Sequence, residues 1–256
     1  MSELASDTVP GLSAKVVHLW KIPLAESAPQ GIDLDLPELL AADELTRYRG
    51  ISHPRSRSEY LRSRVALRLV LASYLECQAS TICFSYNEYG KPELTENKIP
   101  NLHFNLSHSG DYCVLAVTAE HEIGVDIERC NAGRDYAALA QRFFSVAEHQ
   151  LLESKADEVM FYRMWVLKEA AVKSMGIRLL AGLDRFECFL LPSGCLGIKD
   201  RLQQPGAPDW SIFQWQPDQD TVAAVVVKNS PVVFVKRNLQ DISQLVQHTA
   251  RLIVPA

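Results

Sequence analysis

The order of its predicted elements constrains the fold of this chain most, because a helical pattern followed by several short strand patterns occurs twice. In the first half, apolar residues recur at helical spacing between Pro54 and Glu76, namely Leu61, Val65, Leu69 and Ala72. Strand patterns follow over residues 82–86, 102–106, 112–118 and 123–128, and after the second helical region over 186–191, 211–215, 221–227 and 232–236. This order predicts an α+β fold of two similar halves, 1–120 and 121–256, that meet near residue 120.

Capping signals add detail to the helical regions. Ser145 and Glu148 form an S-x-x-E capping box ahead of an apolar run. Asp157 is a candidate N-cap of a helix that reaches Met175, and Gly176 is a suitable stop. The remaining predicted elements are helices over 37–49 and 239–253 and a strand over 16–22.

Composition excludes several classes of protein. The chain has 256 residues, of which 26 are basic and 31 acidic, so its net charge is −5, and 47% are apolar. These values exclude a disordered or collagen-like chain, and the mild acidity argues against a general nucleic-acid-binding protein. No apolar run approaches the roughly 20 residues that span a bilayer, and residues 1–12 lack the basic start of a signal peptide.

The six cysteines favour a reducing compartment. They lie far apart, form no C-x-x-C pair and mostly have apolar neighbours, at positions Cys77, Cys83, Cys113, Cys130, Cys188 and Cys195. This pattern predicts reduced thiols in a cytoplasmic protein rather than a zinc site or a disulfide framework.

The segment Gly124–Glu128 is the first candidate site. On a strand, Asp126 and Glu128 share one face, while Val125 and Ile127 point into the core. Adjacent carboxylates repel unless a cation lies between them, and oxygen ligands suit a hard ion such as Mg²⁺. The alternatives are the polar face of a half-exposed strand and a glycosidase acid pair, although no aromatic sugar platform lies near it in the sequence.

The segment Trp165–Lys173 is the second candidate. Trp165, Glu169 and Lys173 lie on one helical stripe, which on its own describes a surface ion pair. The segment is apolar almost all round, however, so we expect a buried helix. The charged residues Lys168, Glu169 and Lys173 then need partners, which a bound metal and an anionic ligand would supply.

The segment Asn105–Asp111 is the third candidate, because it follows a strand with small hydroxyl residues, a histidine and a glycine. Such a turn suits phosphate binding. A Ser-His-Asp hydrolase is the alternative, but adjacent side chains on an extended segment point apart and no G-x-S-x-G elbow exists.

The region from Arg47 to Arg68 is the fourth candidate, with seven arginines against the single acid Glu59. A solvated helix face explains several of them. The excess in an acidic chain nevertheless predicts a local anion site, to which Lys91 in the turn Gly90–Pro92 adds a further cation.

In combination and in this order, the motifs resemble those of the surfactin-type 4′-phosphopantetheinyl transferases. They are Gly90-Lys91-Pro92, Asn105-Leu106-Ser107-His108-Ser109, Gly124-Val125-Asp126-Ile127-Glu128 and Phe161-Tyr162-x-x-Trp165-x-x-Lys168-Glu169-Ala170-x-x-Lys173. The resemblance covers roughly residues 40–190. It implies two α/β halves related by a pseudo-twofold axis, with the active site at their interface.

The resemblance also implies the activity. A 4′-phosphopantetheine group would pass from coenzyme A to a serine of an apo carrier protein of the acyl, polyketide or peptidyl type. The reaction would depend on Mg²⁺, with Mn²⁺ as an alternative ion, and would release adenosine 3′,5′-bisphosphate. Two halves in one chain would form a complete site, so we expect a monomer that binds neither nucleic acid nor membrane.

The family's residue roles transfer to matching positions. Asp126, Glu128 and Glu169 would hold the metal, and Glu169, or a water that it orients, would accept the serine proton. Lys168 and Lys173 would contact phosphate oxygens. The catalytic residues that the resemblance implies are Asp126, Glu169 and Lys173.

The resemblance assigns the nucleotide half of coenzyme A to the first half of the chain. Ser107 and His108 would bind its phosphates, and Lys91 would line the nucleotide pocket. Arg47 would contact the 3′-phosphate, with Arg64 as a further candidate.

Three other functions remain open from the sequence. A non-catalytic module that binds coenzyme A or a nucleotide would keep the basic residues but would not need Asp126, Glu128 and Glu169 together. A Mg²⁺-dependent phosphohydrolase would release phosphate without a carrier. A nucleic-acid-binding protein would use the arginines of 47–68 and would bind with a steep salt dependence.

Overall fold

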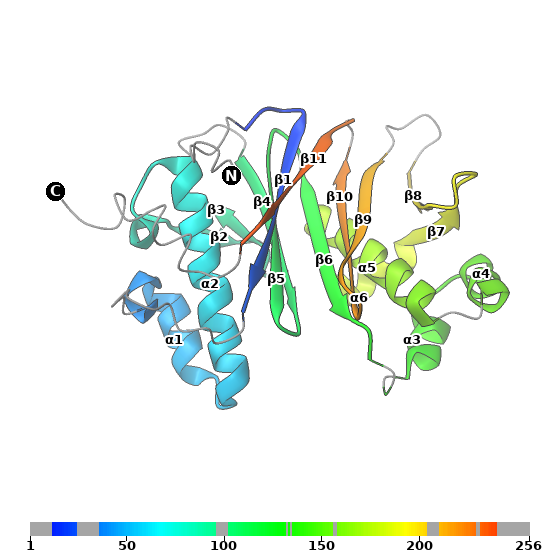
Figure 1. Cartoon of the computed structure of the whole chain (residues 1–256), viewed down its shortest axis with the longest axis horizontal. Coiled ribbons are helices and arrows are strands. Elements are labelled where there is room, and N and C mark those ends of the chain that lie inside the picture. The colour runs from blue at the N-terminus through cyan, green and yellow to red at the C-terminus, as the bar shows by residue number, and fades with distance from the viewer. Residues whose placement is uncertain are drawn as a thin grey trace, which may run out of the picture.

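Two β-sheets lie side by side at the centre of the structure, a computed structural model, and helices cover the outer face of each (Figure 1). The structure describes residues 12–24, 36–95, 102–131, 133, 135–155, 158–203, 210–228 and 231–239. The arrangement is α+β, as the sequence predicted, with helix, sheet, sheet and helix in successive layers.

The first sheet has the strand order β11-β1-β5-β4. Its strands are β1 (Val16–Pro23), β4 (Leu102–Ser109), β5 (Tyr112–Ala119) and β11 (Val233–Asn238). Helices α1 (Ala42–Gly50) and α2 (Pro54–Leu75) lie on its outer side, next to the short hairpin of β2 (Phe84–Tyr86) and β3 (Pro92–Leu94). Strand β11 joins this sheet in parallel with β1, although it comes from the far end of the chain.

The second sheet has the order β6-β10-β9 and is antiparallel throughout. Its strands are β6 (Ile123–Arg129), β9 (Trp210–Asp218) and β10 (Thr221–Lys228). Helix α5 (Glu158–Ser174) lies across its outer face (Figure 1). The remaining elements on that side are α3 (Tyr136–Phe143), α4 (Val146–Lys155), α6 (Leu179–Gly182), β7 (Phe186–Leu190) and β8 (Leu196–Asp200).

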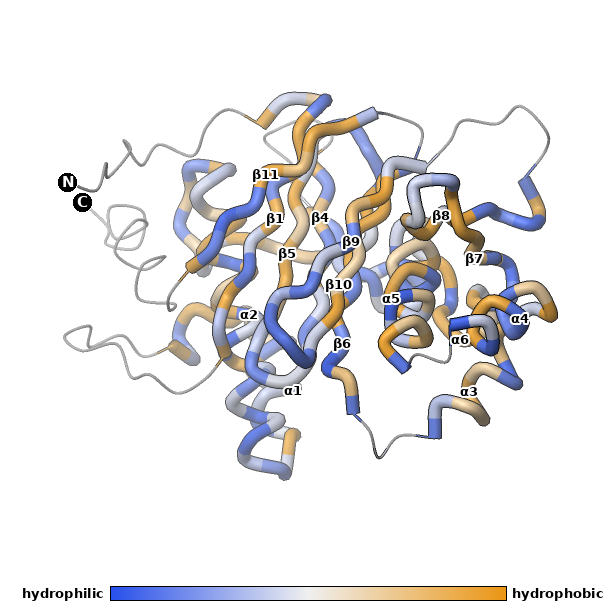
Figure 2. Tube along the Cα trace, turned by 45° about the vertical axis from the view of Figure 1, so that its right-hand side comes forward, coloured by the Kyte–Doolittle hydropathy of each residue, from blue (hydrophilic) through white to orange (hydrophobic). Residues whose placement is uncertain are grey.

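Three apolar clusters hold the layers together. One lies between α2 and the first sheet, and another lies between α5 and the second sheet. The third joins the inner faces of the two sheets, where Val17 and Val114 meet Val125 and Val225. Figure 2 shows the hydrophobic residues concentrated along the central strands β5 and β10. Among the described residues, every helix is too short or too polar to cross a membrane.

The predicted strands and the long helices over 54–76 and 157–175 are present with shifted ends. The capping box is also confirmed, because Ser145 N–H donates to Glu148 and Glu148 N–H donates to Ser145. Asp157 and the helix predicted over 239–253, apart from Leu239, lie outside the described residues.

Three local predictions were wrong. The helix expected over 37–49 breaks, because residues 36–39 form one 3₁₀ turn and α1 begins at Ala42 after the Glu44 carboxylate accepts from Ala41 N–H. The turn expected over Ser107–Asp111 begins later, because β4 continues up to Ser109. The short strands β3 and β8 were missed, since three and five residues carry too little alternating pattern.

The crossing of β11 bears on the predicted halves. Val233 lies opposite Val16, and the pairing continues to Asn238 opposite Lys21. Residues 1–120 therefore do not contain the whole of the first sheet. The division into 1–120 and 121–256 remains a prediction about the domains, with β11 as a strand exchanged across it.

A buried histidine gives the first sheet a predicted pH dependence. His18 is 2% exposed, and its Nδ1 lies 2.7 Å from the Tyr74 hydroxyl, which also accepts from the Trp20 indole N–H. Burial, and after it the charge of Arg237, lowers the pKa of His18 from 6.5 to about 4. The unfolded chain therefore binds the proton more readily, and stability falls as the pH drops from 6.5 towards 4.

We expect His18→Asn to flatten this acid limb, the loss of stability as the pH falls from 6.5 towards 4. A shift of this size corresponds to about 3 kcal/mol of stability lost between neutral pH and pH 4. Urea unfolding at a series of pH values measures the limb in both proteins. An acid limb of equal slope in His18→Asn would assign the loss of stability to other groups.

Candidate functional site

The first candidate site of the sequence lies where β6 crosses α5. Gly124 makes the crossing possible, because a Cβ at that position would lie 1.9 Å from the Ala170 carbonyl oxygen and 2.4 Å from Ser174 N. Any side chain there would push the strand away from the helix. Sequence reasoning used Gly124 only as part of a motif, and a glycine inside a strand was the signal of this close approach.

Asp126 is the most enclosed acid of this region, with 2% of its surface exposed. Its Oδ1 accepts from the Ser107 hydroxyl of β4 at 2.7 Å and from the Lys173 ammonium of α5 at 2.5 Å. Its Oδ2 is buried and has no hydrogen-bond partner in the part of the chain that the structure describes. A buried carboxylate oxygen without a partner is unfavourable, so this atom is open to a ligand that carries positive charge.

Glu169 lies beside this group on α5, where Lys173 Nζ is 3.4 Å from its Oε2. Burial raises the pKa of Glu169 to about 8, and the charges of Asp126 and Glu128 add to the increase. The pKa of Lys173 is also raised, since Asp126 and Glu169 outweigh the effect of its burial. The predicted stripe of Glu169 and Lys173 is therefore present and faces the two acids of β6.

Glu128 completes the set, which we call the carboxylate cluster: Asp126, Glu128 and Glu169. Glu128 is half-buried, and one of its oxygens accepts from the Ser109 hydroxyl at 3.3 Å. Within the described part of the chain, no three acidic, histidine or cysteine side chains converge tightly enough to form a finished metal cage. Lys173 supplies the positive charge at the cluster in this conformation.

The chemistry of the cluster still fits a divalent cation. Asp126 and Glu169 share the Lys173 ammonium, the charge of Glu128 acts on Glu169, and Asp126 Oδ2 has no hydrogen-bond partner among the described residues. Carboxylate oxygens are the ligands of Mg²⁺ and Mn²⁺. A cation would also relieve the repulsion that raises the pKa of Glu169.

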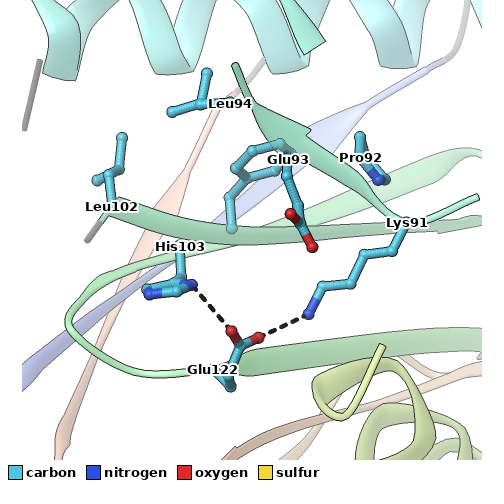
Figure 3. A pocket seen from close by; sticks show the side chains of 8 residues that line it. Lys91, Pro92, Glu93, Leu94, Leu102, His103 and Glu122 are labelled. Atoms are coloured by element: carbon cyan, nitrogen blue, oxygen red, sulfur yellow. Dashed lines mark hydrogen bonds and ion pairs between the residues drawn. The ribbon is translucent and has the colours of Figure 1, made fainter. Parts of the chain in front are cut away.

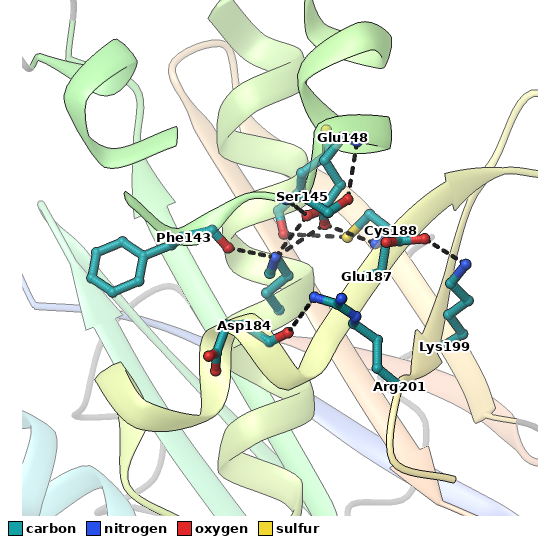
Figure 4. Close-up of polar contacts among 10 residues, drawn as sticks. Phe143, Ser145, Glu148, Asp184, Glu187, Cys188, Lys199 and Arg201 are labelled. Carbon is teal, nitrogen blue, oxygen red and sulfur yellow. Dashed lines mark hydrogen bonds and ion pairs between the residues drawn. The ribbon is translucent and has the colours of Figure 1, made fainter. Parts of the chain in front are cut away.

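The prediction that Lys168 contacts phosphate is wrong. Lys168 is fully buried, and its ammonium donates to both Glu148 oxygens, at 3.1 and 2.9 Å, and to the Phe143 carbonyl at 2.9 Å. Glu148 accepts in addition from the backbone N–H groups of Ser145 and Cys188 (Figure 4). The pair thus joins α4, α5 and β7 in the core, away from the carboxylate cluster.

Lys91 ties the two sides of the molecule together. Its ammonium donates to the Glu122 carboxylate at 3.2 Å and to the carbonyls of Ile123 and Ser174 at 3.4 and 3.3 Å. It lines a pocket of about 280 Å³ that also contains His103 (Figure 3). The role of Lys91 in nucleotide binding stays a prediction, since its charged group is already occupied by protein acceptors.

Ser107 and His108 point to opposite faces of β4, as adjacent strand residues must. Ser107 is buried against Asp126, whereas His108 keeps an exposed side chain on the side of α2. Desolvation by its neighbours lowers the pKa of His108, and Lys173 and Arg64 add to the decrease. The structure thus places His108 between the cluster and the basic helix.

Only some of the arginines in the predicted anion site remain candidates for binding an anion. Arg47 and Arg64 lie over the ring of Tyr60, 5.5 and 5.7 Å from its centre. Arg68 is instead fully buried and bonded to Glu44 at 2.6 Å. Arg47 is exposed, and the structure does not bring it into the carboxylate cluster.

These features define a class of site. Three acids, a lysine and a serine converge where two sheets and α5 meet, and a histidine and two arginines continue the site towards α2. Such a combination suits a substrate with several phosphate groups, because it offers both cations and ligands for a metal.

Comparison with known proteins agrees with this class. A family model described as the 4′-phosphopantetheinyl transferase superfamily matches residues 122–226, and one described as 4′-phosphopantetheinyl transferase, N-terminal, matches residues 36–120. The chain is 36% identical over 215 residues to the 4′-phosphopantetheinyl transferase HetI of Nostoc sp., which covers 82% of the chain and 87% of HetI. It is 33% identical over 184 residues to the 4′-phosphopantetheinyl transferase Sfp of Bacillus subtilis, covering 66% and 79%.

A human relative, L-aminoadipate-semialdehyde dehydrogenase-phosphopantetheinyl transferase, is 36% identical over 141 residues, or 50% of the chain and 46% of the relative. The chain therefore belongs to the 4′-phosphopantetheinyl transferase family and contains both of its domains. It is an enzyme that transfers phosphopantetheine to carrier proteins, in a family that uses coenzyme A.

Proposed function

We propose that this enzyme transfers 4′-phosphopantetheine from coenzyme A to a serine hydroxyl of an apo carrier protein, with Mg²⁺ or Mn²⁺ bound at the carboxylate cluster. The observation that supports this most is the arrangement of Asp126. It is buried, held through Oδ1 by Ser107 and Lys173, and left with Oδ2 open beside Glu169. A phosphoryl transfer site needs such fixed charges, because its catalysis rests on positioning and electrostatic stabilisation.

The bonds of the proposed reaction balance without a further reactant. The serine oxygen attacks the phosphorus next to pantetheine, and the bond from that phosphorus to the bridging oxygen of the diphosphate breaks. The leaving group is adenosine 3′,5′-bisphosphate. The serine proton passes to Glu169 or to a water that it orients.

The other residues hold charge during this step. Asp126, Glu128 and Glu169 would hold the cation, which neutralises the diphosphate when it is bound. Lys173 is a direct candidate for a phosphate contact, because its ammonium already lies among the acids. His108 would bind a phosphate on the side of α2 and Ser107 one on the side of Asp126, with Arg47 and Arg64 at the 3′-phosphate.

We further propose that the site lies at the interface of two similar halves of one chain and that the enzyme acts as a monomer. Ser107 of β4 and Asp126 of β6 meet within the same chain, which supports a complete site without a partner copy. The mass measured by light scattering over a range of concentrations should equal one chain. A stable dimer would contradict this proposal.

Intact-protein mass spectrometry of an apo carrier protein tests the proposed function. The carrier is incubated with this enzyme, coenzyme A and Mg²⁺, beside one sample with EDTA and one carrier variant that lacks its serine. We expect a gain of one phosphopantetheine that requires both metal and serine. A gain in the presence of EDTA would refute the metal assignment, and a gain without the serine would refute the acceptor.

The arginines at Tyr60 yield a separate prediction. If Arg47 contacts the 3′-phosphate, Arg47→Ala should raise the KM for coenzyme A about tenfold, since a charged hydrogen bond contributes roughly 1.5 kcal/mol or more. The KM for 3′-dephospho-coenzyme A should change little. Steady-state kinetics with both substrates measures the difference, and equal losses for both would remove Arg47 from the 3′-phosphate. Arg49→Ala is the matched control, because Arg49 lies two residues further along the exposed end of α1.

A further inference from the structure

Strand β6 carries two acids of the carboxylate cluster and forms the edge of its sheet among the described residues. Strand β10 pairs with one side of β6. Backbone N–H groups on the other side of a buried strand need acceptors, because an unpaired buried amide is unfavourable. Figure 1 shows that β4 and β5 of the first sheet lie on that other side.

Side chains of β4 supply the acceptors. Asn105 Oδ1 accepts from Val125 N–H at 2.8 Å, and Ser109 Oγ accepts from Arg129 N–H at 3.0 Å. Each of these bonds joins residues that are 20 apart in the chain, so the two strands keep one register along their length. Side chains thus replace the backbone ladder that would otherwise join two neighbouring strands.

The acids of the cluster lie between these two bonds. Val125 precedes Asp126, and Arg129 follows Glu128. The Asn105 bond is the more enclosed of the two, since Asn105 is 6% exposed and Val125 is fully buried. Ser107, which lies between Asn105 and Ser109 on the same face of β4, donates to Asp126 at 2.7 Å.

We propose that Asn105 is a positioning residue, which fixes Asp126 and Glu128 against the first sheet by holding the backbone of β6. This inference rests on the proposed function, because it takes the two acids to be metal ligands. Loss of the bond lets β6 slide along β4, so the carboxylates no longer face Glu169 and Ser107 together. Removal of groups that orient metal ligands typically weakens metal binding by about 10- to 100-fold.

The test compares an apolar variant with one that keeps the acceptor. Asn105→Leu has a similar volume but no acceptor for Val125 N–H, whereas Asn105→Asp retains an acceptor oxygen at the same position. Tyr74→Phe is the matched control, because it removes the buried hydrogen bonds that join α2 to His18 and Trp20 of β1 and involves no residue of β6. Thermal unfolding reports the stability of all four proteins.

Binding of Mn²⁺ in the presence of coenzyme A, followed by the electron paramagnetic resonance signal of the free ion, is the deciding measurement. We expect Asn105→Leu to bind Mn²⁺ at least about tenfold more weakly than the wild type, with Asn105→Asp restoring most of the affinity. Tyr74→Phe should lose stability and keep the wild-type affinity. If Asn105→Leu does not fold, Asn105→Ala removes the same acceptor with a smaller side chain and should also weaken Mn²⁺ binding.

Several outcomes would overturn the proposal. Wild-type affinity in a folded Asn105→Leu, or in Asn105→Ala where Asn105→Leu does not fold, would reduce the bond to a structural one. Failure of Asn105→Asp to restore binding would mean that the acceptor is not what matters. A wild-type enzyme that binds no Mn²⁺ would refute the metal assignment itself, and the wild type alone shows that result.

Discussion

Replacement of Asp126 by alanine is expected to lower the rate of phosphopantetheine transfer by about 1,000-fold or more while the protein stays folded. The change removes a carboxylate whose Oδ1 holds Lys173 and Ser107 and whose Oδ2 is free for a cation. Stabilisation of charge by a bound metal contributes several kcal/mol to a transition state, and about 4 kcal/mol corresponds to three powers of ten in rate. Initial rates of carrier modification at saturating coenzyme A measure the effect.

The folded state should tolerate this change. The acid is buried beside a lysine, so its loss leaves Lys173 with Glu169 as its remaining partner in the cluster. Asp220→Ala serves as a control, since Asp220 lies in the exposed turn between β9 and β10. Transfer at the wild-type rate by Asp126→Ala would remove Asp126 from the site. If Asp126→Ala shows no unfolding transition, its loss of transfer reflects unfolding and not a loss of catalysis.

Replacement of Lys168 by methionine is expected to destabilise the protein by about 3–5 kcal/mol, the usual loss when one partner of a buried ion pair is removed. The Glu148 carboxylate would remain buried without its ammonium partner, and the N–H groups of Ser145 and Cys188 would remain as donors. Methionine fills a similar volume, so the loss reflects the uncompensated charge rather than a cavity. Urea unfolding followed by tryptophan fluorescence measures it.

A double variant separates this role from a role in catalysis. Glu148→Gln together with Lys168→Met removes both charges and keeps an acceptor for the Ser145 and Cys188 N–H groups, so it should recover much of the stability. If Lys168 contacted phosphate, Lys168→Met would instead keep its stability and raise the KM for coenzyme A. That pattern would contradict the buried pair.

The sequence predicts the cluster well because the periodicities of strand and helix are reliable over short distances. Alternation along β6 puts Asp126 and Glu128 on one face, and helical spacing puts Glu169 and Lys173 on one stripe of α5. The same spacing already separated Lys168 from that stripe, since neighbouring helix residues point about 100° apart. Grouping Lys168 with Glu169 by proximity in the sequence overlooked this difference.

The partners of these residues were harder to predict, because they come from distant parts of the chain. Glu148 was recognised as the end of a capping box, but nothing in its local pattern points to a lysine 20 residues later. Asn105 belongs to a sequence motif, but the motif does not show that its side chain bonds to a backbone group of β6. Such contacts depend on how the sheets pack, which local patterns do not encode.

The fold class was predicted correctly, but the pairing of the strands within the sheets was not. Two regions of helix followed by strands correctly indicated an α+β fold. The pairing of β11 with β1 was missed, because its alternating pattern describes a strand without naming a neighbour. The sequence was equally compatible with a last strand that does not pair with the first sheet.

This return has a consequence for synthesis of the protein on the ribosome. Strand β1 emerges before its partner β11, which follows more than 200 residues later. Until then β1 presents one open edge, which is a site for unwanted pairing with other chains. Completion of the first sheet therefore has to await the synthesis of β11, and a fragment cut near residue 120 would be released with that edge uncovered.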